Sequence, residues 1–171
     1  MLLTVLKWPD TRLLNVARDV PAVTDDVRAL VANLFETMRI EGGVGLAATQ
    51  VGVDWRVVVI DCSARDPRTR AHALINPRIV ARDGTVLWRE GCLSVPGITA
   101  EVERAQHVVV EYRDVEGTLR AHEAVDLEAV CIQHELDHLD GRLYIDRLGA
   151  LERKAALLDY DEARRRGERV L

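Results

Sequence analysis

The stretch Gln133-His134-Glu135-Leu136-Asp137-His138 contains an H-E-x-x-H pattern, which is typical of a metal-binding helix. On an α-helix, residues four positions apart lie one turn apart on the same face, so the imidazoles of His134 and His138 can bind one ion. Glu135 then lies beside that ion without being a ligand. The alternative interpretation is a pair of ordinary histidines on a helix surface.

The residues around this stretch predict the helix itself. Asp126 is a suitable N-cap, and Gly141 ends the helical pattern. Because the helix is amphipathic and buries residues on both sides of the histidine pair, the surface alternative is disfavoured. The apolar residues at helical spacing are Leu127, Val130, Ile132, Leu136 and Leu139.

A catalytic metal site here needs a third protein ligand. Two histidines leave a tetrahedral divalent ion short of one ligand if the fourth position stays open for water. No histidine follows the motif, and Glu152 and Glu162 lie in a charged segment without supporting context. Cys131 and Cys92 are better candidates. Cys131 lies a full helical turn before His134, so its short side chain would reach an ion bound by both histidines only with difficulty. Helix geometry therefore disfavours Cys131 as the third ligand.

Two further helices and several strands are expected. Thr24 is a suitable N-cap for an N-terminal helix that ends at Gly42-Gly43. Short β-rich runs follow, and Val115-Glu116-Gly117 looks like a hairpin turn in which Gly117 is available for a positive φ. These runs include residues 56–60, 107–112 and 118–122.

The C-terminal segment, about residues 148–171, is charged and reads as a solvated helix and tail. Its apolar stripe consists of Leu151, Ala155 and Leu158. Together these elements predict an α+β fold in a single domain spanning residues 1–171. We expect antiparallel β-sheets packed around a central metal-binding helix, with an N-terminal helix and a C-terminal helix.

Composition limits the classes of function. The 171 residues are 48% hydrophobic, which suits one compact core, and a formal net charge of -5 gives no field that attracts nucleic acid. The first residues lack a signal peptide pattern, and no segment approaches the ~18 apolar residues of a membrane span. We therefore expect a soluble, cytoplasmic protein. Three cysteines, Cys62, Cys92 and Cys131, form no disulfide framework.

Three separated motifs resemble the peptide deformylase family, in the same order along the chain. They are Gly43-Val44-Gly45-Leu46-Ala47-Ala48-Thr49-Gln50, Glu90-Gly91-Cys92-Leu93-Ser94 and the H-E-x-x-H segment, and the similarity covers most of residues 5–147. The resemblance implies a metal-dependent amide hydrolase that removes the N-formyl group from N-formyl-methionine of new polypeptides, giving formate and a free amino terminus. The alternatives are an H-E-x-x-H zinc endopeptidase and a non-catalytic metal-binding domain.

The resemblance also implies roles for particular residues. Glu135 would move protons, while the Gln50 amide and the Leu93 backbone N–H would stabilise the negative oxygen of the intermediate. The implied ligands of the ion are Cys92, His134 and His138. Substrate contacts are expected from Gly43, Val44, Gly45, Gly91, Trp88, Leu127, Val130 and Cys131.

The implied cofactor is one divalent metal ion per chain, Fe²⁺ in the cell, with Zn²⁺, Ni²⁺ or Co²⁺ in purified protein. The expected partners are nascent N-formyl-methionyl polypeptides near the ribosome, with no membrane and no sequence-specific nucleic acid. A monomer or a weak homodimer is expected.

The sequence departs from the family pattern in three places. Thr49 stands where many relatives have proline, Thr99 stands where some bacterial members have arginine, and Asp126-Leu127-Glu128 opens the metal helix where a stretch that begins with glycine and often contains arginine is common. Thr99 and Glu128 are expected to make the entrance of the substrate site less basic. Glu90 and Arg104 are expected either to hold the cysteine segment rigid or to form an ordinary surface ion pair.

Overall fold

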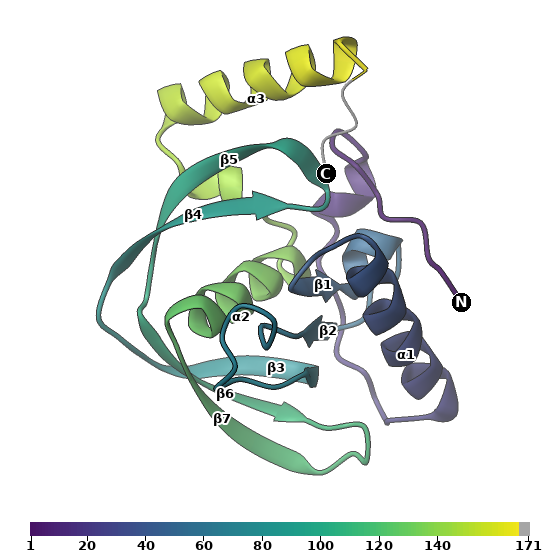
Figure 1. Cartoon of the computed structure of the whole chain (residues 1–171). Coiled ribbons are helices and arrows are strands. Elements are labelled where there is room, and N and C mark those ends of the chain that lie inside the picture. Colours follow the sequence, from purple (N-terminus) through teal and green to yellow (C-terminus); the bar gives the residue numbers. More distant parts are fainter. Residues whose placement is uncertain (168–171) are drawn as a thin grey trace.

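The fold consists of two antiparallel β-sheets on either side of one helix. The computed structural model describes residues 1–167 of the chain. Helix α2 (Asp126–Leu139) runs between the two sheets (Figure 1), which confirms the expected α+β fold. The larger sheet has the order β1 (Gly45–Ala47), β2 (Val57–Ile60), β3 (His72–Asp83), β6 (His107–Arg113) and β7 (Leu119–Val125), and the smaller sheet pairs β4 (Val86–Cys92) with β5 (Val95–Arg104).

Helix α2 is buried along almost its whole length. Every residue from Glu128 to Leu139 is buried, including the charged ones. Its apolar residues pack into the core of the larger sheet. A helix with a single apolar stripe normally turns its polar residues toward water. Because α2 lies between two sheets, its polar side chains must find partners inside the protein.

The two ends of α2 are fixed in different ways, and only one matches the prediction. Asp126 is the first helical residue rather than the N-cap, and its φ is +53°. Its N–H donates to the Gln106 carbonyl and its carboxylate accepts from Gln106 Nε2, so this connection replaces a side-chain cap. Gly141 follows the helix as predicted, with φ +73°; a Cβ there would lie 2.5 Å from the Leu14 carbonyl oxygen.

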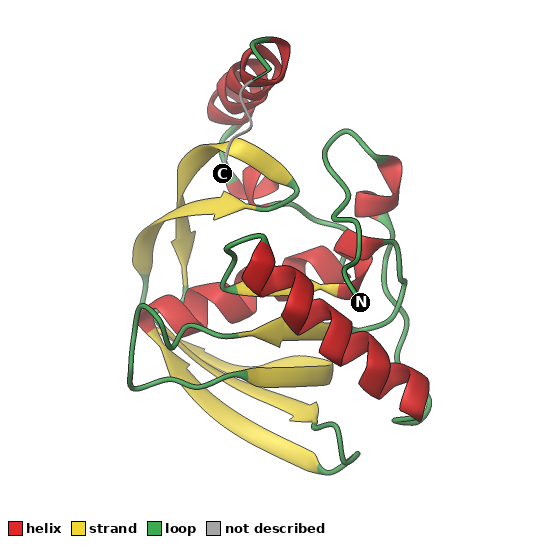
Figure 2. Cartoon of the chain, turned by 45° about the vertical axis from the view of Figure 1, so that its right-hand side comes forward, coloured by secondary structure: helices red, strands yellow, loops and turns green. Residues whose placement is uncertain are grey.

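The predicted N-terminal helix is confirmed as α1 (Asp25–Ile40), which covers β1 and β2 at one edge of the larger sheet (Figure 2). Thr24 is its N-cap, and its side-chain oxygen accepts from the Val27 N–H. Gly42, with φ +75°, follows its end. The predicted strands at 56–60, 107–112 and 118–122 correspond to β2, β6 and β7, with Gly117 at φ +82° in the β6–β7 turn.

The C-terminal helix α3 (Ala150–Arg165) packs against the smaller sheet, at the top of Figure 1. The apolar stripe seen in the sequence does not make this contact, since Leu151 is 84% and Leu158 57% exposed. The packing residues are instead Ala156, Leu157 and Tyr160. Residues 168–171 of the predicted tail lie outside the described residues. Within residues 1–167, no helix is long and apolar enough to cross a membrane.

Candidate metal centre

Three potential metal ligands come together where the end of β4 meets α2. Cys92 is the last residue of β4, and His134 and His138 lie one turn apart on α2. Cys92 Sγ is 3.3 Å from His138 Nε2, which is 3.3 Å from His134 Nε2. All three atoms lie within 4.8 Å of one another, although β4 and α2 are far apart in the sequence. The residues implied as ligands by the family resemblance therefore form one group.

The geometry and chemistry of this group fit a divalent ion. Two nitrogen ligands bound at about 2.0 Å to one tetrahedral ion lie about 3.3 Å apart. The two imidazole nitrogens have this separation. Burial opposes ionisation of Cys92, but His138 and His134 hold the pKa of its thiol well below the usual value and favour the metal-binding thiolate. Three protein ligands leave a fourth position for water or substrate.

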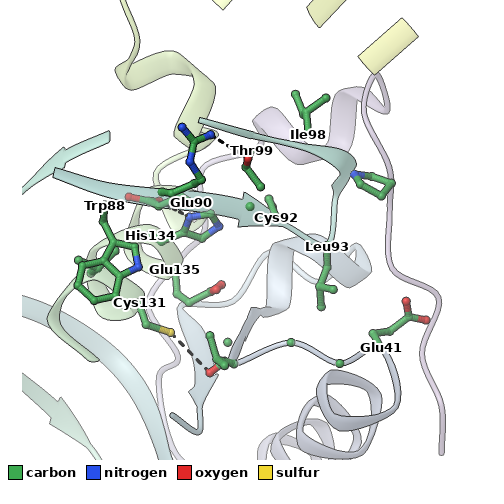
Figure 3. Close-up of a pocket in the computed structure, with 18 of the residues that line it drawn as sticks. Glu41, Trp88, Glu90, Cys92, Leu93, Ile98, Thr99, Cys131, His134 and Glu135 are labelled. Atoms are coloured by element: carbon green, nitrogen blue, oxygen red, sulfur yellow. Dashed lines mark hydrogen bonds and ion pairs between the residues drawn. The ribbon is translucent and has the colours of Figure 1, made fainter. Parts of the chain in front are cut away.

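Cys131, the other candidate from the sequence, lies outside this group of ligand atoms. Its Sγ donates a hydrogen bond to the Val44 carbonyl oxygen at 3.5 Å (Figure 3). A hydrogen bond with Cys62, together with burial, raises the pKa of Cys131 well above its usual value. The thiol is therefore kept protonated, which is a poor form for binding a metal.

Glu90 fixes the orientation of His134. Its Oε1 lies 2.7 Å from His134 Nδ1, so the other ring nitrogen, Nε2, faces Cys92 and His138. Burial opposes ionisation of Glu90, but Arg104 and His134 hold the pKa of its carboxyl below the usual value. An ionised Glu90 accepts a hydrogen bond from the Nδ1–H and leaves Nε2 free to bind an ion, as carboxylates behind metal-binding histidines commonly do.

Arg104, on β5, links this carboxylate to α2. Its guanidinium donates to both oxygens of Glu90, at 2.7 and 2.9 Å, and to Asp137 Oδ2 at 2.7 Å. Asp137 also accepts two hydrogen bonds from Arg147. The side chains of Arg104, Glu90 and Asp137 are between 3% and 8% exposed. The Glu90–Arg104 pair is therefore buried and is not an ordinary surface ion pair.

Glu135 lies between the ligand group and β1. A Cβ on Gly45 would lie 2.5 Å from Glu135 Oε1, so only glycine at position 45 leaves room for this carboxylate. Among the described residues, Glu135 Oε2 has no hydrogen-bond partner. Burial raises the pKa of Glu135, despite the opposing effect of the two histidines. The carboxylate is therefore held close to the ligands with one oxygen free to exchange a proton.

Gln50 and Leu93 are two further predicted site residues close to Cys92. The Gln50 side-chain oxygen accepts from the Ala47 N–H at 2.9 Å, and its Nε2 donates to Ser94 Oγ at 3.0 Å and lies 3.7 Å from Cys92 Sγ. This network orients the amide N–H groups toward the ligand group. Leu93 is in the turn between β4 and β5, directly after Cys92.

A cavity of about 470 Å³ opens beside the ligand group (Figure 3). Its walls come from the segment before β1, from β4 and β5, and from α2. The structure brings every predicted catalytic and substrate-binding residue to this cavity: Glu135, Gln50, Leu93, Gly43, Val44, Gly45, Gly91, Trp88, Leu127, Val130 and Cys131. Their individual roles stay predictions.

The charge at the cavity differs from the expectation drawn from Thr99 and Glu128. Thr99 lines the cavity, but Glu128 is 4% exposed and does not. The cavity also carries basic side chains that sequence reasoning missed, namely Lys7, Arg65 and Arg89. No local pattern marks them, because they come from loops and strands separated along the chain. The prediction that Glu128 makes the entrance less basic is wrong.

Similarity to known proteins extends over most of the chain. Residues 2–154 match the family model described as polypeptide deformylase. A peptide deformylase of Pseudoalteromonas translucida is 48% identical over 152 residues, covering 89% of this chain and 90% of that protein. A solved peptide deformylase from Legionella pneumophila has a TM-score of 0.91 at 36% identity and covers 100% of both chains. One from Thermus thermophilus has a TM-score of 0.87 at 36% identity, with 97% of this chain and 99% of that chain covered.

The buried ion-pair network predicts the effect of removing Arg104. Arg104→Met leaves Glu90 and Asp137 buried without this cation, so we expect the free energy of unfolding to fall by about 3–5 kcal/mol in urea titrations. Arg89→Met is the matched control, because Arg89 pairs with Glu101 at 3.8 Å and both side chains are more than half exposed. The control should lose less than about 1 kcal/mol. Equal losses in the two variants would contradict a structural role for the network.

Proposed function

This chain belongs to the polypeptide deformylase family, and we propose that it removes the formyl group from nascent polypeptides that begin with N-formyl-methionine. The products are formate and a free amino terminus. The observation that carries the proposal is the closeness of Cys92 Sγ, His138 Nε2 and His134 Nε2, beside a cavity that also contains Glu135. Such a site can hydrolyse an amide whose carbonyl reaches the ligand group.

Cys92, His134 and His138 would hold a divalent ion, which would supply Lewis acidity and so make water a better nucleophile near neutral pH. Thiolate and imidazole ligands suit Fe²⁺, Zn²⁺, Co²⁺ and Ni²⁺, and the family resemblance favours Fe²⁺ in the cell. The Glu90 carboxylate would contribute by accepting a hydrogen bond from His134 Nδ1–H, which leaves Nε2 as the atom that would bind the ion.

Glu135 carries the proton during the reaction. Its free oxygen takes a proton from the attacking water and later delivers it to the leaving amine, as a general base and then a general acid. The narrow space beside Gly45 restricts where the carboxylate can move. General acid–base catalysis by one positioned residue contributes about 10²–10⁴-fold to the rate.

Gln50 and Leu93 stabilise the negative charge that develops on the formyl oxygen. Gln50 is anchored through its side-chain oxygen, so its amide N–H groups are already oriented before substrate binds. The Leu93 backbone N–H follows Cys92 directly in the turn between β4 and β5. Fixed donors of this kind cost no reorganisation when charge appears, and losing one typically costs about 3 kcal/mol of transition-state stabilisation.

The methionine side chain and the peptide backbone occupy different parts of the cavity. Val44, Leu127 and Val130 provide an apolar wall for an unbranched thioether. The β1 strand is at the edge of the larger sheet, so an extended substrate can add to it as a further strand along Gly43 and Gly45. Lys7, Arg65 and Arg89 line the same cavity, as does the acidic Glu41, and we propose that these charges contact residues beyond the methionine.

The substrate also suggests where the protein acts. Formylated amino termini occur on chains that are leaving the ribosome, so we propose action in the cytoplasm close to the ribosome, by a monomer or a weak homodimer. We further propose that residues 1–171 work as one domain. The larger sheet packs against α2 and α1, and the smaller sheet packs against α3.

Replacing Glu135 by glutamine should separate metal binding from catalysis. Glu135→Gln keeps the size of the side chain but cannot accept the proton, so we expect a full equivalent of metal and a fall of about 10²-fold or more in kcat. The measurement is deformylation of formyl-Met-Ala-Ser by anaerobically prepared, iron-loaded protein, with metal content determined on the same sample. A variant that loses its metal would contradict the assigned role.

Replacing the two nearby cysteines tests which of them is the ligand. Cys92→Ser exchanges a soft thiolate for a hard hydroxyl, so metal content after dialysis should fall or the preference among divalent ions should change. Cys131→Ser is the matched control, because its sulfur faces the Val44 carbonyl and Cys62, and it should keep its metal. The opposite result would make Cys131 the third ligand.

A further inference from the structure

A second group of potential metal ligands lies apart from the catalytic ligands. His72 is the first residue of β3, His122 lies on β7, and Glu128 lies in the first turn of α2. One potential ligand atom from each lies within 4.8 Å of the other two. The rings of His72 and His122 have centroids 4.3 Å apart, and His122 Nε2 is 2.5 Å from Glu128 Oε1. None of these residues lines the substrate cavity.

Two buried polar atoms in this group lack partners. His72 is 8% exposed and Glu128 is 4% exposed. Within residues 1–167, His72 Nε2 and Glu128 Oε2 have no hydrogen-bond partner. Leaving a polar atom buried without a partner costs about 1–3 kcal/mol, so such atoms are rare unless they bind something. Both atoms are good metal donors, and both belong to the same three-residue group.

An ordinary ion pair between His122 and Glu128 does not account for the whole arrangement. His107 and Glu123 on the same hairpin show what such a pair looks like here, since their atoms are 4.0 Å apart and their side chains are 33% and 76% exposed. The group of His72, His122 and Glu128 is instead drawn from three separate elements and is largely removed from water. An ion pair between His122 and Glu128 also gives no partner to His72 Nε2.

We propose that His72, His122 and Glu128 form a second metal site that binds Zn²⁺. Two imidazoles and one carboxylate are a known ligand set for zinc. Because it has no thiolate, this set of ligands is harder than the set of Cys92, His134 and His138. The His122 side chain is 24% exposed, which gives an ion a path to the otherwise buried ligands.

The location gives this site a structural consequence. The first turn of α2 has no side-chain cap, and Glu128 precedes His134 on the same helix by six residues. An ion held by β3, β7 and α2 ties that uncapped turn to the larger sheet. Because the ion binds only the folded chain, it stabilises the helix that carries the catalytic histidines.

The number of bound ions tests the proposal directly. Metal-free protein is loaded with Zn²⁺, weakly held ions are removed by gel filtration, and zinc per chain is measured by mass spectrometry. The wild type should hold two equivalents, and His122→Ala and Glu128→Gln one equivalent each. His107→Ala, a histidine outside the group on the same hairpin, should still hold two.

Cobalt spectra identify which equivalent is lost. A Co²⁺ ion bound to the Cys92 thiolate gives a sulfur-to-metal charge-transfer band in the near ultraviolet, whereas the proposed site has only nitrogen and oxygen donors. Both variants should therefore keep this band while losing the second equivalent of Co²⁺. One equivalent in the wild type, or two equivalents in both variants, would overturn the proposal. Loss of the thiolate band in the variants would also overturn it, because the effect would then come from the catalytic site.

Discussion

The carboxylate of Glu90 is the point on which the metal centre depends, because it joins two segments that are distant in the sequence. It accepts from Arg104 on β5 and faces His134 Nδ1 on α2. Cys92, two residues further along β4, is thereby held within reach of both histidines. Neither β4 nor α2 contains the complete ligand set. The distances between the ligand atoms therefore depend on this buried junction.

Placing a polar helix between two sheets requires such a junction. The residues of α2 from Glu128 to Leu139 are buried, although several of them carry ionisable side chains. Burying charges without partners would cost several kcal/mol each. Arg104 and Arg147 form ion pairs with Asp137, and Glu90 lies within hydrogen-bond distance of His134 Nδ1. A bound ion would be the remaining partner of the His134 and His138 rings. The same interactions that make burial tolerable also orient the ligands, so stability and preorganisation have a common origin.

Local sequence patterns predicted much of this arrangement. The spacing of His134 and His138, the cap at Thr24 and the turn at Gly117 each depend on residues close in the chain, and the structure contains all three features. The sequence could not show which partner would fix Asp126, which face of α3 would pack, or that Glu128 points inward to His122. Each of these depends on contacts between distant segments. Choosing Cys92 needed the family resemblance, since geometry on one helix could only disfavour Cys131.

We propose that the metal, Glu135 and the donors around Cys92 form a site shaped for a formyl group. The most direct test compares kcat/KM for formyl-Met-Ala-Ser and acetyl-Met-Ala-Ser on one metal-loaded preparation. We expect no room for an acetyl methyl group beside Gly45, where even a Cβ on the glycine would lie 2.5 Å from Glu135 Oε1 and 2.9 Å from Cys131 Sγ. Displacing the carbonyl by about 1 Å costs about 10²-fold in rate, so the formyl peptide should be preferred by at least that factor. Comparable values for the two peptides would contradict the claim.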